Sequence, residues 1–221
     1  MSENLPTVAV IGGTGNLGAA LAKRLAAAGR RVLIGSRDAE RARAAAAQLG
    51  ASLGAGTNAE VAAAADVVIV AVPFASQRTT LQDIAPHVAG KIVVDTTVPL
   101  VPPKVMRVQL PPEGSAALIA QQVLGPSVRV VSAFHNVAAH KLATDEKVEC
   151  DVLVFGDDRK ARDVVVALAD ACGLRGVHAG ALANSVAAES LTSIIIFINK
   201  TYAVDGAGVR ITGQLVPPAA G

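Results

Sequence analysis

Short apolar runs and alanine-rich stretches alternate along the first half of the chain. The apolar runs are rich in β-branched side chains and predict strands at residues 7–11, 31–34, 67–72 and 91–94. The stretches between them consist of helix-forming residues and predict helices at residues 17–28, 40–49 and 77–84. Gly29 and Gly50 directly follow two of these helices, as expected for residues that end a helix. Apolar strands separated by helices are typical of a parallel sheet covered on both faces.

The second half continues the alternation after an irregular, proline-rich connection at residues 99–112. It predicts helices at 115–124 and 159–172, strands at 128–134, 152–155 and 174–178, and a long final helix at 184–202. The fold class that we expect is α/β: a doubly wound, Rossmann-like, mostly parallel sheet with a small C-terminal lobe that ends in the long helix. We place the domain boundary at residue 135, with residues 1–135 as the larger domain and 136–221 as the smaller one.

A glycine-rich turn joins the first predicted strand to the first predicted helix. Residues 13–18 read Gly-Thr-Gly-Asn-Leu-Gly, which matches GxGxxG in the strand–turn–helix setting that a dinucleotide-binding motif requires. Gly15 would let the backbone approach a pyrophosphate, and the N–H groups of the first helical turn would face that anion. The alternative is a tight turn in which the glycines serve backbone shape alone.

The end of the second predicted strand distinguishes NADP from NAD. An NAD site places Asp or Glu near this point to hold the ribose 2′-hydroxyl. The chain instead has Ser36 and Arg37, and Arg41 follows one helical turn later on the same face. A hydroxyl and two guanidinium groups suit a 2′-phosphate, which a carboxylate would repel, so these residues predict NADP despite the neighbouring Asp38. The alternative is that both arginines are solvated charges on a helix face.

Composition narrows the classes of partner. Hydrophobic residues make up 52% of the chain and charged residues 17%, which excludes disorder through low hydrophobicity. Aromatic residues make up only 2%, and 20 basic residues are balanced by 18 acidic ones. The chain therefore lacks both the aromatic platform and the basic surface that are typical of nucleic-acid binding, and we expect no nucleic-acid partner.

No feature of the sequence predicts a membrane or metal partner. The strongest apolar run, residues 67–75, contains Pro73 and is far shorter than the about 20 residues that a spanning helix needs. The N-terminus lacks the pattern of a signal peptide. Cys150 and Cys172 stand alone, without the spacing of a zinc site or a disulfide framework. We therefore expect a cytoplasmic protein.

Further segments carry a resemblance to a known family. They read Val-Pro-Phe at 72–74, Val-Pro at 98–99, Ser-Ala-Ala at 115–117, Ser-Ala-Phe-His at 132–135, Gly-Asp-Asp at 156–158, Asn-Ser at 184–185 and Glu-Ser-Leu-Thr at 189–192. Together with the glycine turn and Gly-Ser-Arg at 35–37, these segments resemble the NADPH-dependent F420 reductases, also called F420H2:NADP oxidoreductases, from about residue 7 to residue 210. The resemblance implies an enzyme that transfers a hydride between C4 of NADP(H) and C5 of the deazaflavin of coenzyme F420. It makes residues 1–135 the NADP-binding domain and 136–221 the part that completes the F420 site.

The resemblance also implies roles for individual residues. The NADP contacts would come from Gly13, Thr14, Gly15, Asn16, Leu17, Ser36, Arg37, Arg41, Phe74 and Ala139. The F420 contacts would come from His135, Asn136, Val137, Ser190, Thr192 and Ala207.

His135 is the candidate catalytic residue, because it ends an apolar strand where such sheets present ligands. It would donate a hydrogen bond to the deazaflavin or face the anion that develops there; the alternative is a structural histidine bonded to nearby backbone. Ser190 and Thr192 either contact F420 or bond back to their own helix.

Two other functions remain open from the residues alone. One is an NADPH-dependent reductase of another flavin, a quinone or an imine, and the other is a non-catalytic, NADPH-responsive regulator. The loop at His135 and the helix face at Ser190 and Thr192 favour an enzyme, since a regulator needs no second ring site. The final helix is apolar at every position from 194 to 198, and consecutive residues cannot all lie on one amphipathic face. The helix is therefore either central to the fold or buried in a homodimer interface. The family resemblance supports the homodimer.

Overall fold

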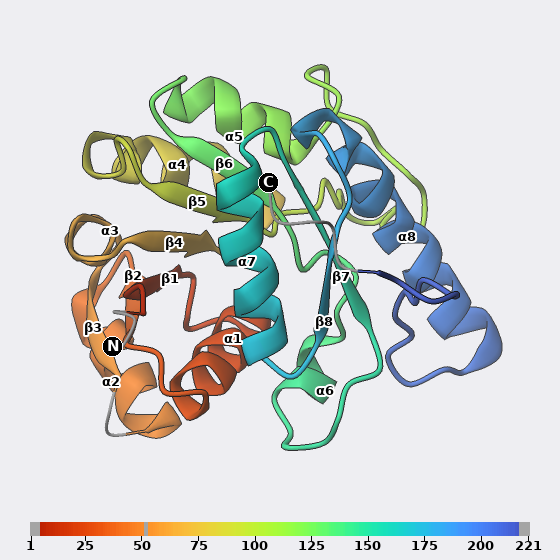
Figure 1. The fold of residues 1–221 in the computed structure, drawn as a ribbon, viewed down its shortest axis with the longest axis horizontal. Helices are drawn as coiled ribbons and strands as arrows, with labels where there is room; N and C mark the ends of the chain where they lie inside the picture. Colours follow the sequence, from red (N-terminus) through yellow and green to blue (C-terminus); the bar gives the residue numbers. More distant parts are fainter. Residues whose placement is uncertain (1–4, 51–52, 217–221) are drawn as a thin grey trace.

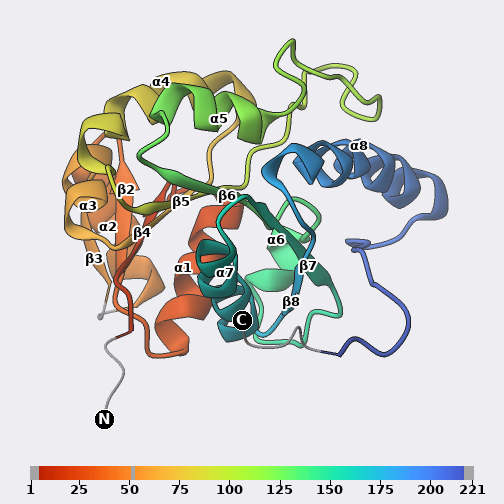
Figure 2. The same ribbon diagram turned by 45° about the horizontal axis from the view of Figure 1, so that its top comes forward.

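The computed structural model describes residues 5–50 and 53–216. Within these residues, eight strands form one sheet in the order β3-β2-β1-β4-β5-β6-β7-β8. Neighbouring strands run parallel except β6 and β7, which pair antiparallel. Helices cover both faces of the sheet (Figure 2). The expected doubly wound, mostly parallel α/β fold is therefore confirmed.

The elements follow the apolar pattern closely. The strands are β1 (Val8–Ile11), β2 (Val32–Ser36), β3 (Gly54–Thr57), β4 (Val67–Val70), β5 (Ile92–Asp95), β6 (Arg129–Ser132), β7 (Asp151–Gly156) and β8 (Arg175–His178). The α-helices are α1 (Asn16–Ala27), α2 (Ala39–Leu49), α3 (Asn58–Ala64), α4 (Phe74–Ile84), α5 (Ala116–Leu124), α6 (Ala139–Leu142), α7 (Arg159–Ala171) and α8 (Ser185–Tyr202). Short 3-10 helices, η1 (Ala85–His87) and η2 (Leu182–Asn184), precede β5 and α8. The sequence predicts each strand and α-helix to within a few residues, except β3, α3 and α6.

The missed strand β3 is an edge strand without large side chains. It reads Gly-Ala-Gly-Thr and pairs in parallel with β2. A Cβ atom on Gly54 would lie 2.5 Å from Leu33 Cδ2, so the strand fits against β2 because it is small. Thr57 then begins α3 through a capping box with Glu60, which is a local reason for the helix that follows.

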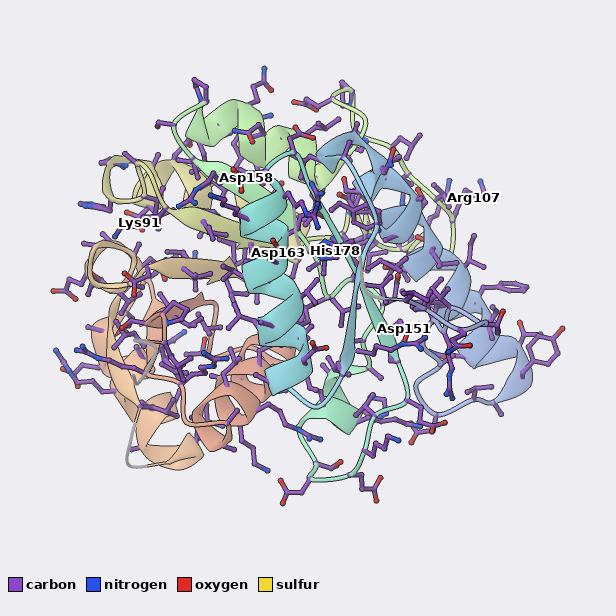
Figure 3. The ribbon with its side chains drawn as sticks, in the orientation of Figure 1. Lys91, Arg107, Asp151, Asp158, Asp163 and His178 are labelled. Carbon is purple, nitrogen blue, oxygen red and sulfur yellow. The ribbon has the colours of Figure 1, made fainter. Side chains whose placement is uncertain are left out.

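Two apolar cores lie on opposite faces of the sheet. Val8 and Val10 of β1 contribute to the core on the side of α1, α2 and α7, whereas Ala9 and Ile11 contribute to the core beneath α3, α4 and α5. Alternate side chains of a strand point to opposite faces, so a strand buried on both sides is apolar throughout. The helix α7 contacts β8 through side chains as well, since Asp163 Oδ1 lies 3.3 Å from His178 Nε2 (Figure 3).

The topology creates a crevice at the carboxyl edge of the sheet. From β1 the chain moves outward to β2 and β3, then returns to β4 on the other side of β1 and continues to β5 and β6. The order of strands therefore switches direction between β1 and β4, where open α/β sheets hold their ligands. The β1–α1 turn and the β4–α4 loop, residues 71–73, lie at this point.

The helix α8 leaves the sheet and extends past its edge. Its N-terminal part lies beside α5 in both ribbon views, and its far end extends away from the sheet (Figures 1 and 2). In the described part of the chain, Leu182–Tyr202 is one stretch long and apolar enough to cross a membrane, and 33% of it is buried inside the protein. This stretch is longer than the apolar run at residues 67–75, because it includes polar residues such as Ser190 and Thr192 between the apolar ones. Ile195 is buried, whereas Ile194 and Phe197 are 46% and 53% exposed.

Candidate functional site

The glycine turn after β1 is tightly packed and leaves a helix N-terminus open. Gly12 has φ +79°, and a Cβ atom there would lie 2.4 Å from the Ala71 carbonyl oxygen. A Cβ atom on Gly18 would lie 2.4 Å from the Gly12 carbonyl oxygen. The helix α1 begins at Asn16, and its N-cap residue Gly15 provides no side-chain bond to the first N–H groups. These N–H groups are suited to an anion, which would supply the missing acceptors.

A cavity of about 210 Å³ lies in front of this turn. It collects residues from the β1–α1 turn, the end of β2, the start of α3 and the β4–α4 segment. Its lining consists of Gly12, Thr14, Gly15, Ser36, Arg37, Asp38, Arg41, Asn58, Ala71, Val72, Pro73, Ser76 and Thr80. The predicted NADP residues Thr14, Gly15, Ser36, Arg37 and Arg41 therefore share one cavity.

The two arginines reach the cavity in a different way from that expected. Arg37 lies before the helix, because Asp38 is the N-cap of α2, so a shared helical face does not relate it to Arg41. The Asp38 carboxylate accepts from the Glu40 and Arg41 backbone N–H groups at 2.9 and 3.4 Å. This capping engages the carboxylate whose charge opposes a 2′-phosphate, and Arg41 Nε lies 3.8 Å from its Oδ2 atom. Arg37 and Arg41 both line the cavity.

Other predicted NADP residues surround the cavity without lining it. Gly13 is buried, and a Cβ atom there would lie 2.8 Å from Ile34 Cγ2, so it keeps the turn against the sheet. Asn16 and Leu17 lie in the first turn of α1, and Phe74 opens α4 directly after the lining residue Pro73.

The sequence reasoning missed Asn58. This residue lines the cavity, is only 4% exposed, and its Oδ1 has no hydrogen-bond partner among the described residues. A buried acceptor without a partner is costly unless a ligand or water supplies a donor. No sequence signal pointed to Asn58, because it belongs to α3, which was not predicted.

A second hollow lies between the loop after β6 and α8. It is lined by His135, Asn136, Val137, Ala138, His140, Thr192, Ile195, Ile196, Asn199, Gly206 and Ala207. Five of the six residues predicted to contact F420 are therefore brought together from three distant segments. Asn136 Nδ2 donates to Thr192 Oγ1 and to the Ala188 carbonyl oxygen, both at 3.0 Å. Ala207 N donates to Asn199 Oδ1 at 2.9 Å, which holds the third segment in place.

Two more predicted residues, Ser190 and Ala139, line neither cavity. Ser190 is half-buried on α8 but does not line the hollow that Thr192 lines. Residues two positions apart on a helix point about 200° apart, so the two hydroxyls face different directions. Ala139 begins α6, next to the lining residue Ala138. Thr192 Oγ1 lies 3.1 Å from the His135 carbonyl oxygen and 3.3 Å from that of Ala188, so its hydroxyl donates to backbone rather than to a ligand.

His135 is held by a reversal of the chain after β6. Phe134 has φ +68°, an unusual conformation for a bulky residue, and its side chain is 1% exposed. The reversal brings the His135 ring back to β6, where Nε2 lies 2.8 Å from Ser132 Oγ. Burial lowers the pKa of His135 from 6.5 to about 3, so the ring is neutral near pH 7. A neutral ring suits a hydrogen-bonding role better than that of a charge partner for an anion.

Two buried carboxyl groups accompany His135 and were also missed. Asp95 ends β5 and accepts from Gln77 Nε2 at 2.6 Å, and burial raises its pKa from 3.8 to about 7. Glu189 of α8 accepts from the backbone N–H groups of Ala116 and Ala117 at 2.7 and 3.2 Å. Burial raises the pKa of Glu189 above its usual range, while these backbone donors oppose the rise.

The register of the sheet brings the two cavities near each other. Val70, Asp95 and Ser132 are direct neighbours across β4, β5 and β6. Neighbouring strands lie about 4.8 Å apart, which separates the ends of β4 and β6 by about 10 Å. The loop after β4 lines the first cavity and the loop after β6 lines the second. In the described ranges, no group of three or more His, Cys, Asp or Glu side chains is placed to hold a metal ion.

Comparison with known proteins gives a consistent result. The family model described as NADP oxidoreductase, coenzyme F420-dependent, matches residues 7–99. The F420-dependent NADP reductase of Methanothermobacter thermautotrophicus is 40% identical over 218 residues, covering 93% of this chain and 94% of that protein. That of Methanocaldococcus jannaschii is 38% identical over 219 residues, covering 93% and 97%.

A solved structure supports the same assignment at the level of the fold. A proposed F420-dependent NADP reductase from Arthrobacter sp. FB24 matches with a TM-score of 0.83 and 25% identity, covering 94% of this chain and all of that one. Similarity of this kind extends over both cavities, because each relative covers nearly the whole chain. The chain therefore belongs to the family of coenzyme F420-dependent NADP oxidoreductases.

Proposed function

We propose that this protein transfers a hydride between C4 of NADP(H) and C5 of the deazaflavin of coenzyme F420. The observation that carries the proposal is the pair of cavities at one edge of the sheet. One combines an open helix N-terminus with two arginines, and the other draws on three segments that are far apart in the sequence. Relatives that share the chain over nearly their full length are F420-dependent NADP reductases.

The first cavity fits NADP. The N–H groups at the start of α1 would hold the pyrophosphate, with Gly15 allowing close approach and Thr14 adding a hydroxyl. Ser36, Arg37 and Arg41 would hold the 2′-phosphate through charge-assisted hydrogen bonds. Gly13, Asn16 and Leu17 would support this turn, and Phe74 would flank the nicotinamide end.

The unpartnered Asn58 amide is a further sign that the first cavity holds a ligand. Its buried Oδ1 requires a donor that the described residues do not supply. The ribose hydroxyls and the adenine amino group are donors of the right kind.

The second hollow fits the deazaflavin. Its walls come from residues 135–138, from His140 and from residues 206–207, together with Thr192, Ile195, Ile196 and Asn199 of α8. His135 and Asn136 would hold the ring edge by hydrogen bonds, and Val137 and Ala207 would contact its surface. On this proposal residues 1–135 bind NADP and 136–221 complete the F420 site, with Ala139 near the junction and Ser190 behind the wall.

The protein contributes position rather than reactive groups. The two cofactors supply the hydride chemistry themselves when they are bound. The chain's residues hold two rings at one sheet edge, so that the reacting carbons can approach to about 3–3.5 Å. The apolar side chains Val137 and Ile195, beside a buried, neutral His135, would help to exclude water once both rings are bound.

The surface of α8 supports a proposal for the assembly and location of the protein. We propose a homodimer formed through its exposed side, where Ile194 and Phe197 lie open to solvent. The proline-rich loop that carries the exposed Met106 and Val108 runs beside this helix, since Ser193 Oγ donates to the Arg107 carbonyl oxygen at 3.5 Å. Because the inner side of α8 makes hydrogen bonds to its own chain, we propose a soluble, cytoplasmic protein rather than a membrane-anchored one.

Replacing Arg37 tests the NADP assignment. Each charge-assisted hydrogen bond contributes about 1.5–3 kcal/mol, so Arg37→Ala should weaken NADPH binding by about tenfold to a hundredfold. NADH lacks the 2′-phosphate and should lose less than threefold on an order-of-magnitude scale. Dissociation constants from NADPH and NADH fluorescence measure both effects. Arg43→Ala is the matched control, because Arg43 lies on α2, pairs with Glu40 and does not line the cavity. Equal losses for both cofactors would refute the assignment.

A further inference from the structure

Three side chains meet at the first turn of α5, between the walls of the two cavities. Glu189 of α8 accepts from the N–H groups of Ala116 and Ala117 at 2.7 and 3.2 Å. Gln77 of α4 approaches the same place and donates through Nε2 to the Ala116 carbonyl oxygen at 2.9 Å and to Asp95 Oδ2 at 2.6 Å. A single residue, Ala116, therefore binds α4 through its carbonyl group and α8 through its N–H group.

These contacts are buried and strong. Gln77, Asp95 and Glu189 are 1%, 1% and 2% exposed. Water therefore cannot replace a lost partner without entering the core, and a buried polar group left unpaired is unfavourable. The Glu189 carboxyl group lies at the N-terminus of α5, where the helix dipole favours its anionic form. A second bond joins the same two helices, because Ser185 Oγ donates to Ser115 Oγ at 3.0 Å.

Each helix held at Ala116 carries a wall of one cavity. Gln77 lies between Ser76 and Thr80, which line the first cavity. Glu189 lies one helical turn before Thr192, which lines the second. The N-terminal part of α8 lies next to α5 in both ribbon views (Figures 1 and 2). Movement of either helix against α5 would change the separation of the two walls.

We propose that Gln77 and Glu189 are positioning residues that set the distance between the NADP wall on α4 and the F420 wall on α8. This inference rests on the proposed hydride transfer between the two cofactors. Neither side chain lines a cavity, so each acts through the helix that carries it. Hydride transfer is steeply sensitive to the separation of the reacting carbons, and a displacement of about 1 Å costs about a hundredfold in rate.

The test begins with Glu189→Gln, which keeps the shape of the side chain but places an amide N–H group against one backbone N–H group. We expect kcat to fall by about tenfold to a hundredfold. The dissociation constant for NADPH alone should change less than threefold on an order-of-magnitude scale, because α8 does not line that cavity. Hydrogen exchange should become faster in the amides of α8, with or without F420. Gln77→Met should lower kcat in the same range.

The matched control is Asp158→Asn. Asp158 is the N-cap of α7 and accepts from the Ala161 N–H group at 2.7 Å, so this change also replaces a carboxylate at a helix N-terminus by an amide (Figure 3). Asp158 lines neither cavity, so this change should leave kcat unchanged. If Glu189→Gln fails to fold, Ser185→Ala removes the neighbouring bond to α5 and should lower kcat and loosen α8 in the same direction.

A double variant decides whether the pair acts as a unit. Because both side chains act through Ala116, the kcat of the double variant Gln77→Met, Glu189→Gln should be only slightly below that of the slower single variant. Additive losses, an unchanged kcat in Glu189→Gln, or an equal loss of NADPH affinity would overturn the proposal. A wild-type protein that does not reduce F420 would refute the proposed function, whereas unchanged hydrogen exchange in α8 would refute only the positioning role.

Discussion

The buried carboxyl of Asp95 predicts an unusual dependence of stability on pH. Its folded-state pKa is about 7, whereas an unfolded aspartate has a pKa of 3.8. Between these values the folded protein binds a proton that the unfolded chain has released. The free energy of unfolding contributed by Asp95 is therefore highest below the unfolded pKa and is lost as the pH rises toward 7.

The magnitude follows from the same two pKa values. A difference of about three pKa units corresponds to about 4 kcal/mol, at about 1.4 kcal/mol for each unit. Asp95→Asn removes the titration. Because an asparagine has one acceptor oxygen, it can serve the donor of Gln77 or the backbone N–H group of Thr97, but not both. The variant therefore carries a constant cost of about 1–3 kcal/mol that does not depend on pH.

Urea denaturation of both proteins from pH 4 to pH 8 tests this reasoning. Carboxyl groups remote from Asp95 titrate equally in the two proteins and cancel in the difference between their free energies of unfolding. Glu189 does not cancel fully, because its charge raises the pKa of Asp95 and the two groups therefore interact. We expect the advantage of the wild-type protein over Asp95→Asn to shrink by about 4 kcal/mol across this range. A difference that stays constant, or that grows as the pH rises, would show that Asp95 is not held protonated by burial.

Two further predictions concern the cofactors and the assembly. Phe74 and Phe134 are the aromatic residues near the crevice, and Phe134 is buried in the core, so the nicotinamide should be the main stacking partner of the deazaflavin. Measured by quenching of F420 fluorescence, F420 should therefore bind at least about tenfold more weakly without NADP⁺. Equal F420 affinities with and without NADP⁺ would contradict this. Phe197 is 53% exposed on the outer side of α8, so Phe197→Asp should convert a dimer into a monomer in light scattering; a wild-type monomer would refute the interface.

The hydrophobic pattern predicted most of the fold because each buried strand is apolar on both faces. Val67–Val70 and Ile92–Asp95 are recognisable without knowledge of their neighbours. The strand Gly54–Thr57 is not, since its place depends on room beside β2 rather than on its own side chains. The glycine turn was predictable for a related reason: close backbone approach at Gly12 and Gly18 leaves no space for a side chain.

The site was only partly predictable, and the missing parts depend on tertiary contacts. Ser36 is the last residue of β2 and Arg37 follows it, so the sequence alone predicts their position at the strand end. Asn58 lines the cavity through a helix that the pattern did not show. The contact between Glu189 and Ala116 joins residues 73 positions apart, and no local pattern predicts such a pair.

Helical geometry explains one difference within the predicted F420 residues. Thr192 lines the second hollow and Ser190 does not, because two positions along a helix turn a side chain to the other side. His135 was expected at the strand end, but the neutral state of its ring arises from burial beneath the loop at Phe134.

The most direct test of the central claim is hydride transfer itself. Purified protein is mixed with NADPH and oxidised F420, and the absorbance of the oxidised deazaflavin is followed, with FMN in a parallel reaction. We predict that the deazaflavin absorbance disappears only when NADPH, F420 and protein are all present, and that Arg37→Ala slows the reaction at low NADPH concentration. Turnover with FMN but not with F420, or tight NADPH binding without any turnover, would contradict the account.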